Sequence, residues 1–243
     1  SDAPAFASLA LANGETGVLQ PVAELSALLS PFNVVTHCDA AQAAGRVPID
    51  FAALGLSLMS LSAHKMGGPK GAGALVVRDG TVLEAIFAGG GQERRRRAGT
   101  ENVSGIAGFA AAAAAARRDV ERAGEIRVLR DSLEAALRQR TPEAVVIGAA
   151  AERLPNTTLV AMPGKVAETL VIKLDLMGFA VSAGAACASG KVGASHVLEA
   201  MDVPPEVARG AVRISLGYGT TVGDVETFVA AWTAATRQAA LAA

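Results

Sequence analysis

Lys65 has the sequence surroundings of a lysine that could form a Schiff base. The apolar run at residues 56–61 predicts a buried strand, and Ser62 and His64 lie between this run and the lysine. Burial lowers the pKa of a lysine amine, which enables the amine to attack a carbonyl group. Ser62 and His64 are suited to binding a phosphate or orienting a ring. The alternative is a solvated lysine at the end of a strand. The segments around Lys65 are needed to distinguish a Schiff-base lysine from a solvated one.

A second strand supplies an acid for the same edge of the sheet. Residues 34–38 predict a strand that is followed by Asp39 and Gln42. Because ligands of open α/β sheets bind beyond the carboxyl ends of the strands, we expect Asp39 and Lys65 to lie at one edge. Pyridoxal phosphate needs this pair, a lysine for the Schiff base and an acid for the pyridinium nitrogen. The sequence therefore predicts a pyridoxal phosphate site.

Two cysteines lie in contrasting surroundings. Cys187 lies among glycine, alanine and serine residues near Lys191, where exposure and positive charge favour the reactive thiolate. The alternative is that it is a small buried apolar residue, as free cysteines often are. Cys38 lies in an apolar strand beside Asp39, and we interpret it as structural.

Arg213 lies inside a predicted strand and needs a partner for its guanidinium group. The planar fork of arginine matches a carboxylate, so the partner is either a side chain such as Glu199 or the carboxylate of a substrate. No metal site is expected from the sequence.

These motifs resemble the class V aminotransferase family and, within it, the cysteine desulfurases of the NifS/IscS type. The resemblance covers nearly the whole chain. The segments that carry it are Asp39-Ala40-Ala41-Gln42, Ser62-Ala63-His64-Lys65, Ala183-Gly184-Ala185-Ala186-Cys187-Ala188-Ser189-Gly190 and Arg213-Ile214-Ser215-Leu216-Gly217.

The resemblance implies conversion of L-cysteine to L-alanine, with the sulfur carried as a persulfide on Cys187 to an acceptor such as an iron–sulfur scaffold protein. It also implies a homodimer that serves iron–sulfur cluster assembly or thio-modification. Thr100 matches a threonine that reaches the cofactor phosphate of the other subunit. The implied residues are Lys65, Cys187 and His64 for catalysis, Asp39, Gln42, Ser62, His64, Lys65 and Thr100 for pyridoxal 5'-phosphate, and Arg213 and Asn13 for the substrate.

The chain departs from the family pattern in three places. Gly14 stands where the family has an asparagine that contacts the cofactor hydroxyl, which removes a hydrogen bond of about 0.5–1.5 kcal/mol. Gln42 matches the family's other contact to that hydroxyl. Arg95 and Arg96 are additions to a loop that is otherwise typical of the family. The family also has a phosphate-binding loop and a ring-stacking histidine in a portion before residue 1, so we expect a fragment that binds the cofactor weakly or not at all and has no turnover alone.

Two alternatives stay open at this point. The chain could be a cofactor-poor partner or scaffold subunit, as Gly14 and the absence of the family's phosphate loop would favour. It could also be a different lyase of the same fold, such as a selenocysteine lyase.

Composition excludes several other classes. The chain has 243 residues, a formal net charge of -1 and two cysteines, which favours a cytoplasmic protein without a disulfide framework. No uncharged apolar run reaches about 18 residues, so no membrane helix is expected. The basic run at residues 94–97 belongs to the loop that resembles the family's, with a solvated loop as the alternative. It does not indicate nucleic-acid binding, because the remainder has no basic face and no interleaved aromatic residues.

The predicted fold is α/β, a pyridoxal phosphate-dependent transferase fold of type I. Residues 1–140 would form the C-terminal part of a mostly parallel large domain with a bridging helix, and residues 141–243 a small α+β domain that carries the cysteine loop. The pattern predicts strands near residues 5–12, 71–78, 145–148, 157–162, 180–182 and 212–216, and helices near 21–29, 102–140, 166–177 and 222–240. The strand at 71–78 is expected to be buried, and the resemblance implies that it runs antiparallel in an otherwise parallel sheet.

Overall fold

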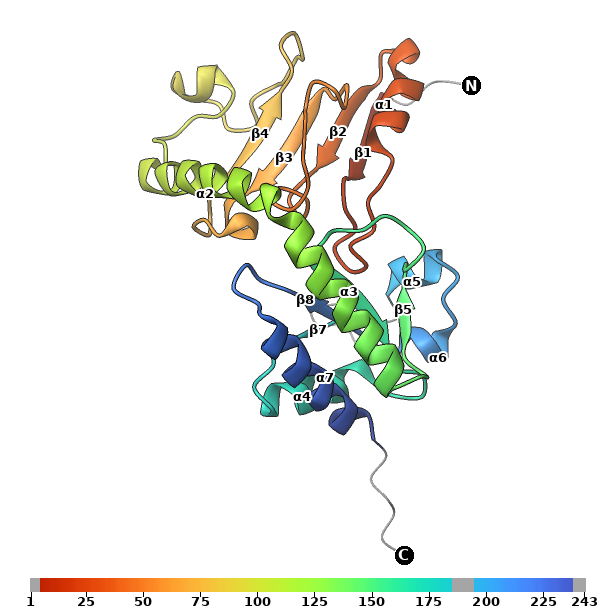
Figure 1. Cartoon of the computed structure of the whole chain (residues 1–243). Helices are drawn as coiled ribbons and strands as arrows, with labels where there is room; N and C mark the ends of the chain where they lie inside the picture. Colours follow the sequence, from red (N-terminus) through yellow and green to blue (C-terminus); the bar gives the residue numbers. More distant parts are fainter. Residues whose placement is uncertain (1–4, 185–194, 238–243) are drawn as a thin grey trace, which may run out of the picture. The chain divides into compact units, whose positions relative to one another are not determined.

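The computed structural model describes residues 5–184 and 195–237 (Figure 1). The chain divides into two compact units. The first contains Ser1–Ala12 and Gln20–Glu121, and the second contains Asn13–Leu19 and Arg122–Ala243. No helix in the described ranges is both long and apolar enough to cross a bilayer.

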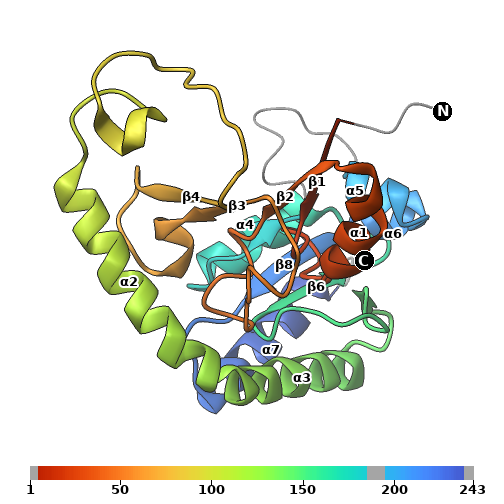
Figure 2. The same cartoon turned by 90° about the horizontal axis from the view of Figure 1, so that it is seen from above.

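The first unit is built on a mixed sheet with the strand order β1-β2-β3-β4 (Figure 2). Strands β1 (Phe6–Ala10), β2 (Val35–Asp39) and β3 (Leu58–Ser62) run parallel, and β4 (Gly73–Val77) is antiparallel to β3. The helices are α1 (Val22–Leu29) and α2 (Val103–Glu121), and short 3-10 turns are η1 (Ser30–Phe32), η2 (Ala63–Met66) and η3 (Gln92–Arg95). The predicted antiparallel direction of β4 is thus confirmed.

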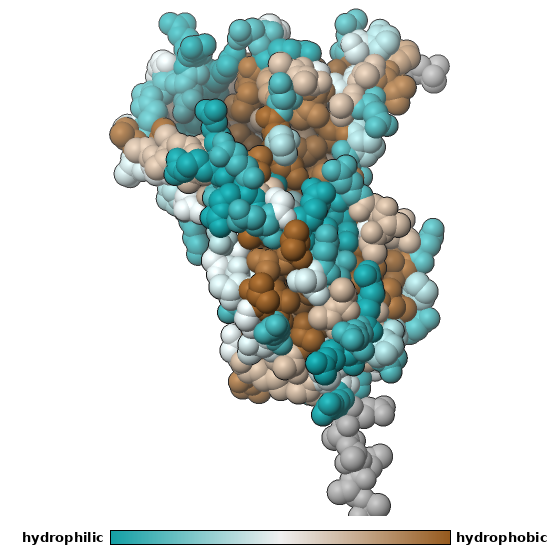
Figure 3. All heavy atoms as spheres, in the orientation of Figure 1, coloured by the Kyte–Doolittle hydropathy of each residue, from teal (hydrophilic) through white to brown (hydrophobic). Residues whose placement is uncertain are grey.

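The prediction that β4 is buried is wrong. Its first three residues are exposed and Leu75 keeps 49 % of its surface accessible. Among the described residues β4 pairs only with β3, so it forms an edge of the sheet. An apolar run predicts burial only where other elements cover both faces and both edges. Figure 3 shows hydrophobic residues at the surface over this sheet.

The long helical region predicted at 102–140 consists of two helices. Helix α2 ends at Glu121 and α3 (Ala123–Arg140) begins after Arg122, whose ψ of 3° is not helical, so the break precedes Gly124. The three-to-four-residue spacing in α3 buries Ile126, Leu133 and Leu137 and leaves Leu129 half-buried, whereas Ile106 of α2 is 48 % exposed. The sequence predicts a boundary after Arg140, but the compact units divide at Glu121 because α3 packs with the second unit.

The second unit has an antiparallel sheet with the order β5-β6-β8-β7. Its strands are β5 (Val145–Ile147), β6 (Thr157–Ala161), β7 (Ser182–Ala183) and β8 (Ala211–Ser215). Beside α3, its helices are α4 (Ala167–Leu176), α5 (His196–Ala200), α6 (Pro205–Ala208) and α7 (Val222–Thr236). The short helices α5 and α6 are not predicted by the sequence pattern.

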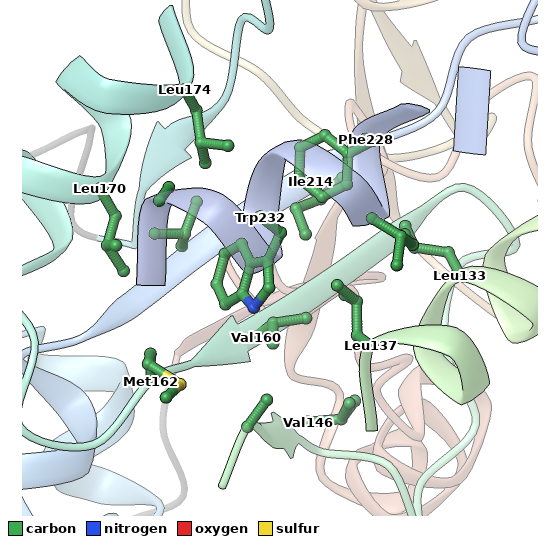
Figure 4. Close-up of a cluster of buried hydrophobic side chains, with 14 of the residues drawn as sticks. Leu133, Leu137, Val146, Val160, Met162, Leu170, Leu174, Ile214, Phe228 and Trp232 are labelled. Atoms are coloured by element: carbon green, nitrogen blue, oxygen red, sulfur yellow. The ribbon is translucent and has the colours of Figure 1, made fainter. Parts of the chain in front are cut away.

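Trp232 lies at the centre of the hydrophobic core of the second unit (Figure 4). Its side chain is fully buried, and α3, α4 and α7 contribute leucine and phenylalanine side chains around it. The sheet closes the other side through residues such as Val160 and Val212. Burying these side chains supplies the main stabilisation that holds β6 and β8 in place.

A buried ion pair joins α3 to the segment before β6. Nη1 of Arg153 donates to Oε1 of Glu134 at 2.8 Å and Nη2 donates to Oε2 at 3.1 Å, and each side chain is 5 % exposed. Arg130 contributes a further contact to the same carboxylate at 3.8 Å. Removing one of two oppositely charged buried groups is destabilising, because the remaining charge stays buried without a counter-ion.

We therefore expect Glu134→Gln to lower the free energy of unfolding by about 3–5 kcal/mol, because Arg153 loses its counter-ion while staying buried. The matched control is Glu125→Gln, which breaks an exposed pair with Arg122 and should cost only about 0–1 kcal/mol. Urea unfolding of both variants measures the difference. Equal losses in the two variants would contradict the interpretation.

Candidate active site

The first cluster lies where two parallel strands end. Strand β2 ends at Asp39 and pairs there with Ser60 of β3, which ends two residues later at Ser62. The Asp39 side chain is exposed, and one of its oxygens accepts a hydrogen bond from the Ala41 backbone at 2.9 Å. The parallel pairing therefore brings the ends of both predicted cofactor segments to one edge of the sheet, as expected.

The 3-10 turn η2 presents the remaining polar residues of this cluster. The Ser62 hydroxyl and Nδ1 of His64 are 2.8 Å apart. Lys65 is half-buried, and its amine has no hydrogen-bond or ion-pair partner within the described residues. Ala63 and Met66 of the same turn are buried, and Met66 packs against Ala112 and Ala116 of α2. Helix α2 thus fixes the turn that carries the lysine.

Two further predicted cofactor residues lie in connecting segments. Gln42 is in the turn after β2, where its backbone oxygen accepts from Arg46 at 3.3 Å and its side-chain amide has no partner in the described ranges. Thr100 is exposed between η3 and α2 and makes no hydrogen bond to the first cluster. Its role toward a second subunit stays a prediction.

A hydrogen-bonded row that the sequence did not reveal crosses three strands before Asp39. His37 of β2 contacts the Ser8 hydroxyl at 2.8 Å through Nδ1 and the Ser60 hydroxyl at 3.2 Å through Nε2. The ring of Phe6 stacks on the ring of His37, with 6.2 Å between the ring centroids. Only the parallel register, which pairs Ser8 with His37, brings these residues together. The row links the strand that ends in Asp39 to both of its neighbours.

Cys38 is inert in this structure. It is fully buried, and burial together with the neighbouring Asp39 charge raises the pKa of its thiol to about 11. A thiol with such a pKa stays protonated near neutral pH and is a poor nucleophile. This supports the interpretation that Cys38 is structural.

The second cluster is built around the turn at residues 13–17, which belongs to the second unit. The Asn13 side-chain oxygen accepts hydrogen bonds from the backbones of Glu15 and Thr16, each at 2.9 Å, and from the Thr16 hydroxyl at 3.1 Å. Gly17 has a φ of 74°, which favours glycine at the end of the turn. Asn13 therefore shapes this turn, and its amide nitrogen is left to bind a ligand.

Arg213 of β8 reaches this turn. Its Nη1 donates to the Gly14 backbone oxygen at 2.6 Å, and its Nε is buried with no hydrogen-bond partner in the described part of the chain. No ion pair joins it to Glu199 in residues 5–184 and 195–237, so the side-chain alternative raised from the sequence is not observed. An arginine with an unused buried donor is suited to an incoming carboxylate.

Cys187 lies outside the described residues, as does the whole segment 185–194. Its proposed role as the sulfur-accepting nucleophile rests on the sequence and stays a prediction.

The comparisons with known proteins agree with this arrangement. The family model described as aminotransferase class V matches residues 1–228. The chain belongs to the class V aminotransferase family. Within this family it is 45% identical over 222 residues to a cysteine desulfurase of Cereibacter sphaeroides, covering 91% of the chain and 57% of that protein. It is 41% identical over 227 residues to the cysteine desulfurase NifS of Azotobacter vinelandii, covering 93% and 56%.

Solved structures of class V members show the same fold. A NifS-like protein from Rickettsia africae ESF-5 has a TM-score of 0.86 and 37% identity, with 95% of this chain and 61% of that chain covered. SspA, solved in complex with cysteine, has a TM-score of 0.69 and 27% identity over 87% of this chain and 58% of its own. The chain spans a little over half the length of the curated relatives that it matches.

The residues of the first cluster fit the cofactor on which this family depends. Lys65 offers an unpaired amine, Asp39 an accessible carboxylate at the end of the neighbouring strand, and Ser62 and His64 a hydroxyl and an imidazole in contact. These are the groups that pyridoxal phosphate requires of a protein. The donor set therefore matches the family's cofactor.

Proposed function

We propose that the chain carries the lysine, substrate-binding and sulfur-accepting residues of a pyridoxal phosphate-dependent cysteine desulfurase. The observation that carries the proposal is the presence of Asp39 and the Lys65 turn at adjacent strand ends of a class V fold. The relatives named cysteine desulfurase and the structure of SspA with cysteine support L-cysteine as the substrate.

Each residue has a chemical role in this proposal. Pyridoxal phosphate, when bound, supplies a conjugated ring that withdraws electrons from the α-carbon of an amino acid. Lys65 would hold the cofactor through its amine and give it up to the amino group of the substrate, and the freed amine would then remove the α-proton. Asp39 keeps the pyridine nitrogen protonated, and Gln42 contacts the ring hydroxyl. Ser62, His64 and, in a homodimer, Thr100 of the second subunit bind the phosphate or orient the ring.

The second cluster acts on the substrate. Arg213 would bind the α-carboxylate with Asn13 beside it. The Cys187 thiolate would attack the sulfur of cysteine, the Cβ–S bond would break, and its electron pair would stay on the β-carbon, which takes up a proton to give alanine. The products are L-alanine and a persulfide on Cys187, which passes its sulfur to an acceptor protein such as an iron–sulfur scaffold.

The test is to saturate the protein with pyridoxal phosphate and measure alanine formed from L-cysteine and selenide released from L-selenocysteine. The resemblance implies weak cofactor binding and no turnover for these residues alone. Saturation offsets the weak binding, and the proposal therefore expects alanine and a persulfide from cysteine. Absence of cofactor binding at any concentration would favour the partner-subunit alternative. Turnover of selenocysteine alone would favour a sibling lyase.

Arg213→Lys should raise the KM for cysteine by about tenfold to a hundredfold, because a lysine keeps the charge but loses the two-pronged contact with a carboxylate. Steady-state kinetics with the cofactor in excess measures the change. The control is Arg209→Lys, an exposed arginine just before β8. An unchanged KM in the Arg213 variant would remove this residue from the substrate site.

A further inference from the structure

We propose that Glu15 is a positioning residue that holds both described ends of the segment carrying Cys187. The inference rests on the proposed function, because it concerns the thiol that accepts sulfur. The residues that carry it lie in the second unit: the turn at 13–17, Gly184, Ser195 and Arg213.

The first contact ties Glu15 to the residue that follows the segment 185–194. Oε2 of Glu15 accepts a hydrogen bond from the Ser195 hydroxyl at 2.6 Å, although the two residues are 180 positions apart. A hydrogen bond from a hydroxyl to a carboxylate is among the stronger hydrogen bonds in proteins. Ser195 is itself only 8 % exposed.

Ser195 in turn contacts a residue of the hydrophobic core. Its hydroxyl oxygen also accepts from the backbone of Leu198 at 3.2 Å and so caps α5. Leu198 is 1 % exposed and packs with Leu159 and Ala211 of the sheet. The carboxylate of Glu15 therefore fixes the start of a helix whose next turn is anchored in the core.

The second contact lies at the other end of the segment. The backbone of Gly184 donates to the Ala211 oxygen at 3.1 Å, which continues the pairing of β7 with β8. A Cβ atom at Gly184 would lie 3.3 Å from the same Oε2 of Glu15. The carboxylate therefore packs against the residue before the segment while it bonds to the residue after it.

The turn that carries Glu15 also holds Arg213. The Asn13 side chain fixes the backbone of Glu15, and the neighbouring Gly14 oxygen accepts from Arg213. One rigid turn thus sets the arginine that would bind the substrate carboxylate and the two ends from which the Cys187 segment departs. Misplacing a reacting group by about 1 Å can cost roughly a hundredfold in rate, so this shared anchor has a kinetic consequence.

The experiment compares Glu15→Ala with Glu15→Gln, using Glu206→Ala on the exposed face of α6 as the matched control. In the cofactor-loaded protein, Glu15→Ala should lower kcat for cysteine by about tenfold or more with KM within about twofold. Glu15→Gln should recover most of the rate, because its amide oxygen still accepts from Ser195. A rise in KM with kcat retained would show that Glu15 serves only the turn and Arg213, and would overturn the inference.

A second readout does not need turnover. Alkylation of Cys187 by iodoacetamide, followed by peptide mass spectrometry on the cofactor-free protein, should be about threefold or more faster in Glu15→Ala than in the wild type, Glu15→Gln or the control. Equal alkylation rates in all four proteins would overturn the inference. If the wild type forms no alanine, the proposed function fails, and the alkylation rates alone decide the role of Glu15.

Discussion

Lys65→Ala is expected to abolish both the covalent attachment of pyridoxal phosphate and the formation of alanine from cysteine. The amine of Lys65 is the group in our proposal that bonds to the cofactor and moves the α-proton, and an alanine can do neither. We expect turnover to fall by about a thousandfold or more, because loss of such a group removes the chemical step itself. Borohydride reduction followed by peptide mass spectrometry measures the attachment.

Two other lysines are the natural competitors, and they provide the control. Lys70 is exposed in the loop before β4, and Lys173 in α4 of the second unit donates to the Ala235 backbone at 3.1 Å. Lys70→Ala should therefore leave the labelling of Lys65 intact. A cofactor label that persists in Lys65→Ala and disappears in either of the other variants would move the assignment.

Cys187→Ser is expected to bind cysteine with an unchanged KM and to form no persulfide. Attack on the substrate sulfur needs a polarisable thiolate, and a serine hydroxyl stays protonated and is a poor nucleophile toward sulfur. Alanine formation should fall by about a hundredfold or more, because the sulfur has no acceptor. Mass spectrometry of the alkylated protein measures the persulfide.

The second cysteine of the chain, Cys38, should not interfere with this experiment. Burial and the Asp39 charge raise the pKa of the Cys38 thiol to about 11, so this cysteine is protonated near neutral pH and is not expected to replace Cys187. Cys38→Ala is the control and should keep the persulfide, although its cavity costs stability. Persulfide on Cys38 in the Cys187→Ser variant would contradict both assignments.

The residues of the first cluster could be predicted because short sequence patterns indicate them. An apolar run followed by Asp39, and another followed by Ser62, His64 and Lys65, indicates two buried strands with polar ends. Parallel strands place their carboxyl ends at one edge, so two local patterns and one topological rule were sufficient. The periodicity of residues 126–137 likewise predicted the buried face of α3, because one face of a helix recurs every three to four residues.

Other features depend on contacts between distant parts of the chain, which no local pattern encodes. The exposure of β4 depends on which elements cover it, and the row from Ser8 through His37 to Ser60 depends on strand register. The turn at 13–17 follows β1 in sequence but packs in the second unit, where the backbone oxygen of Gly14 accepts a hydrogen bond from Arg213. The sequence by itself therefore determined the strands that end in Asp39 and Ser62, and it predicted which residues react there. Only the tertiary structure decided that Glu15 binds Ser195, since a hydrogen bond across 180 residues forms only after both partners are folded into place.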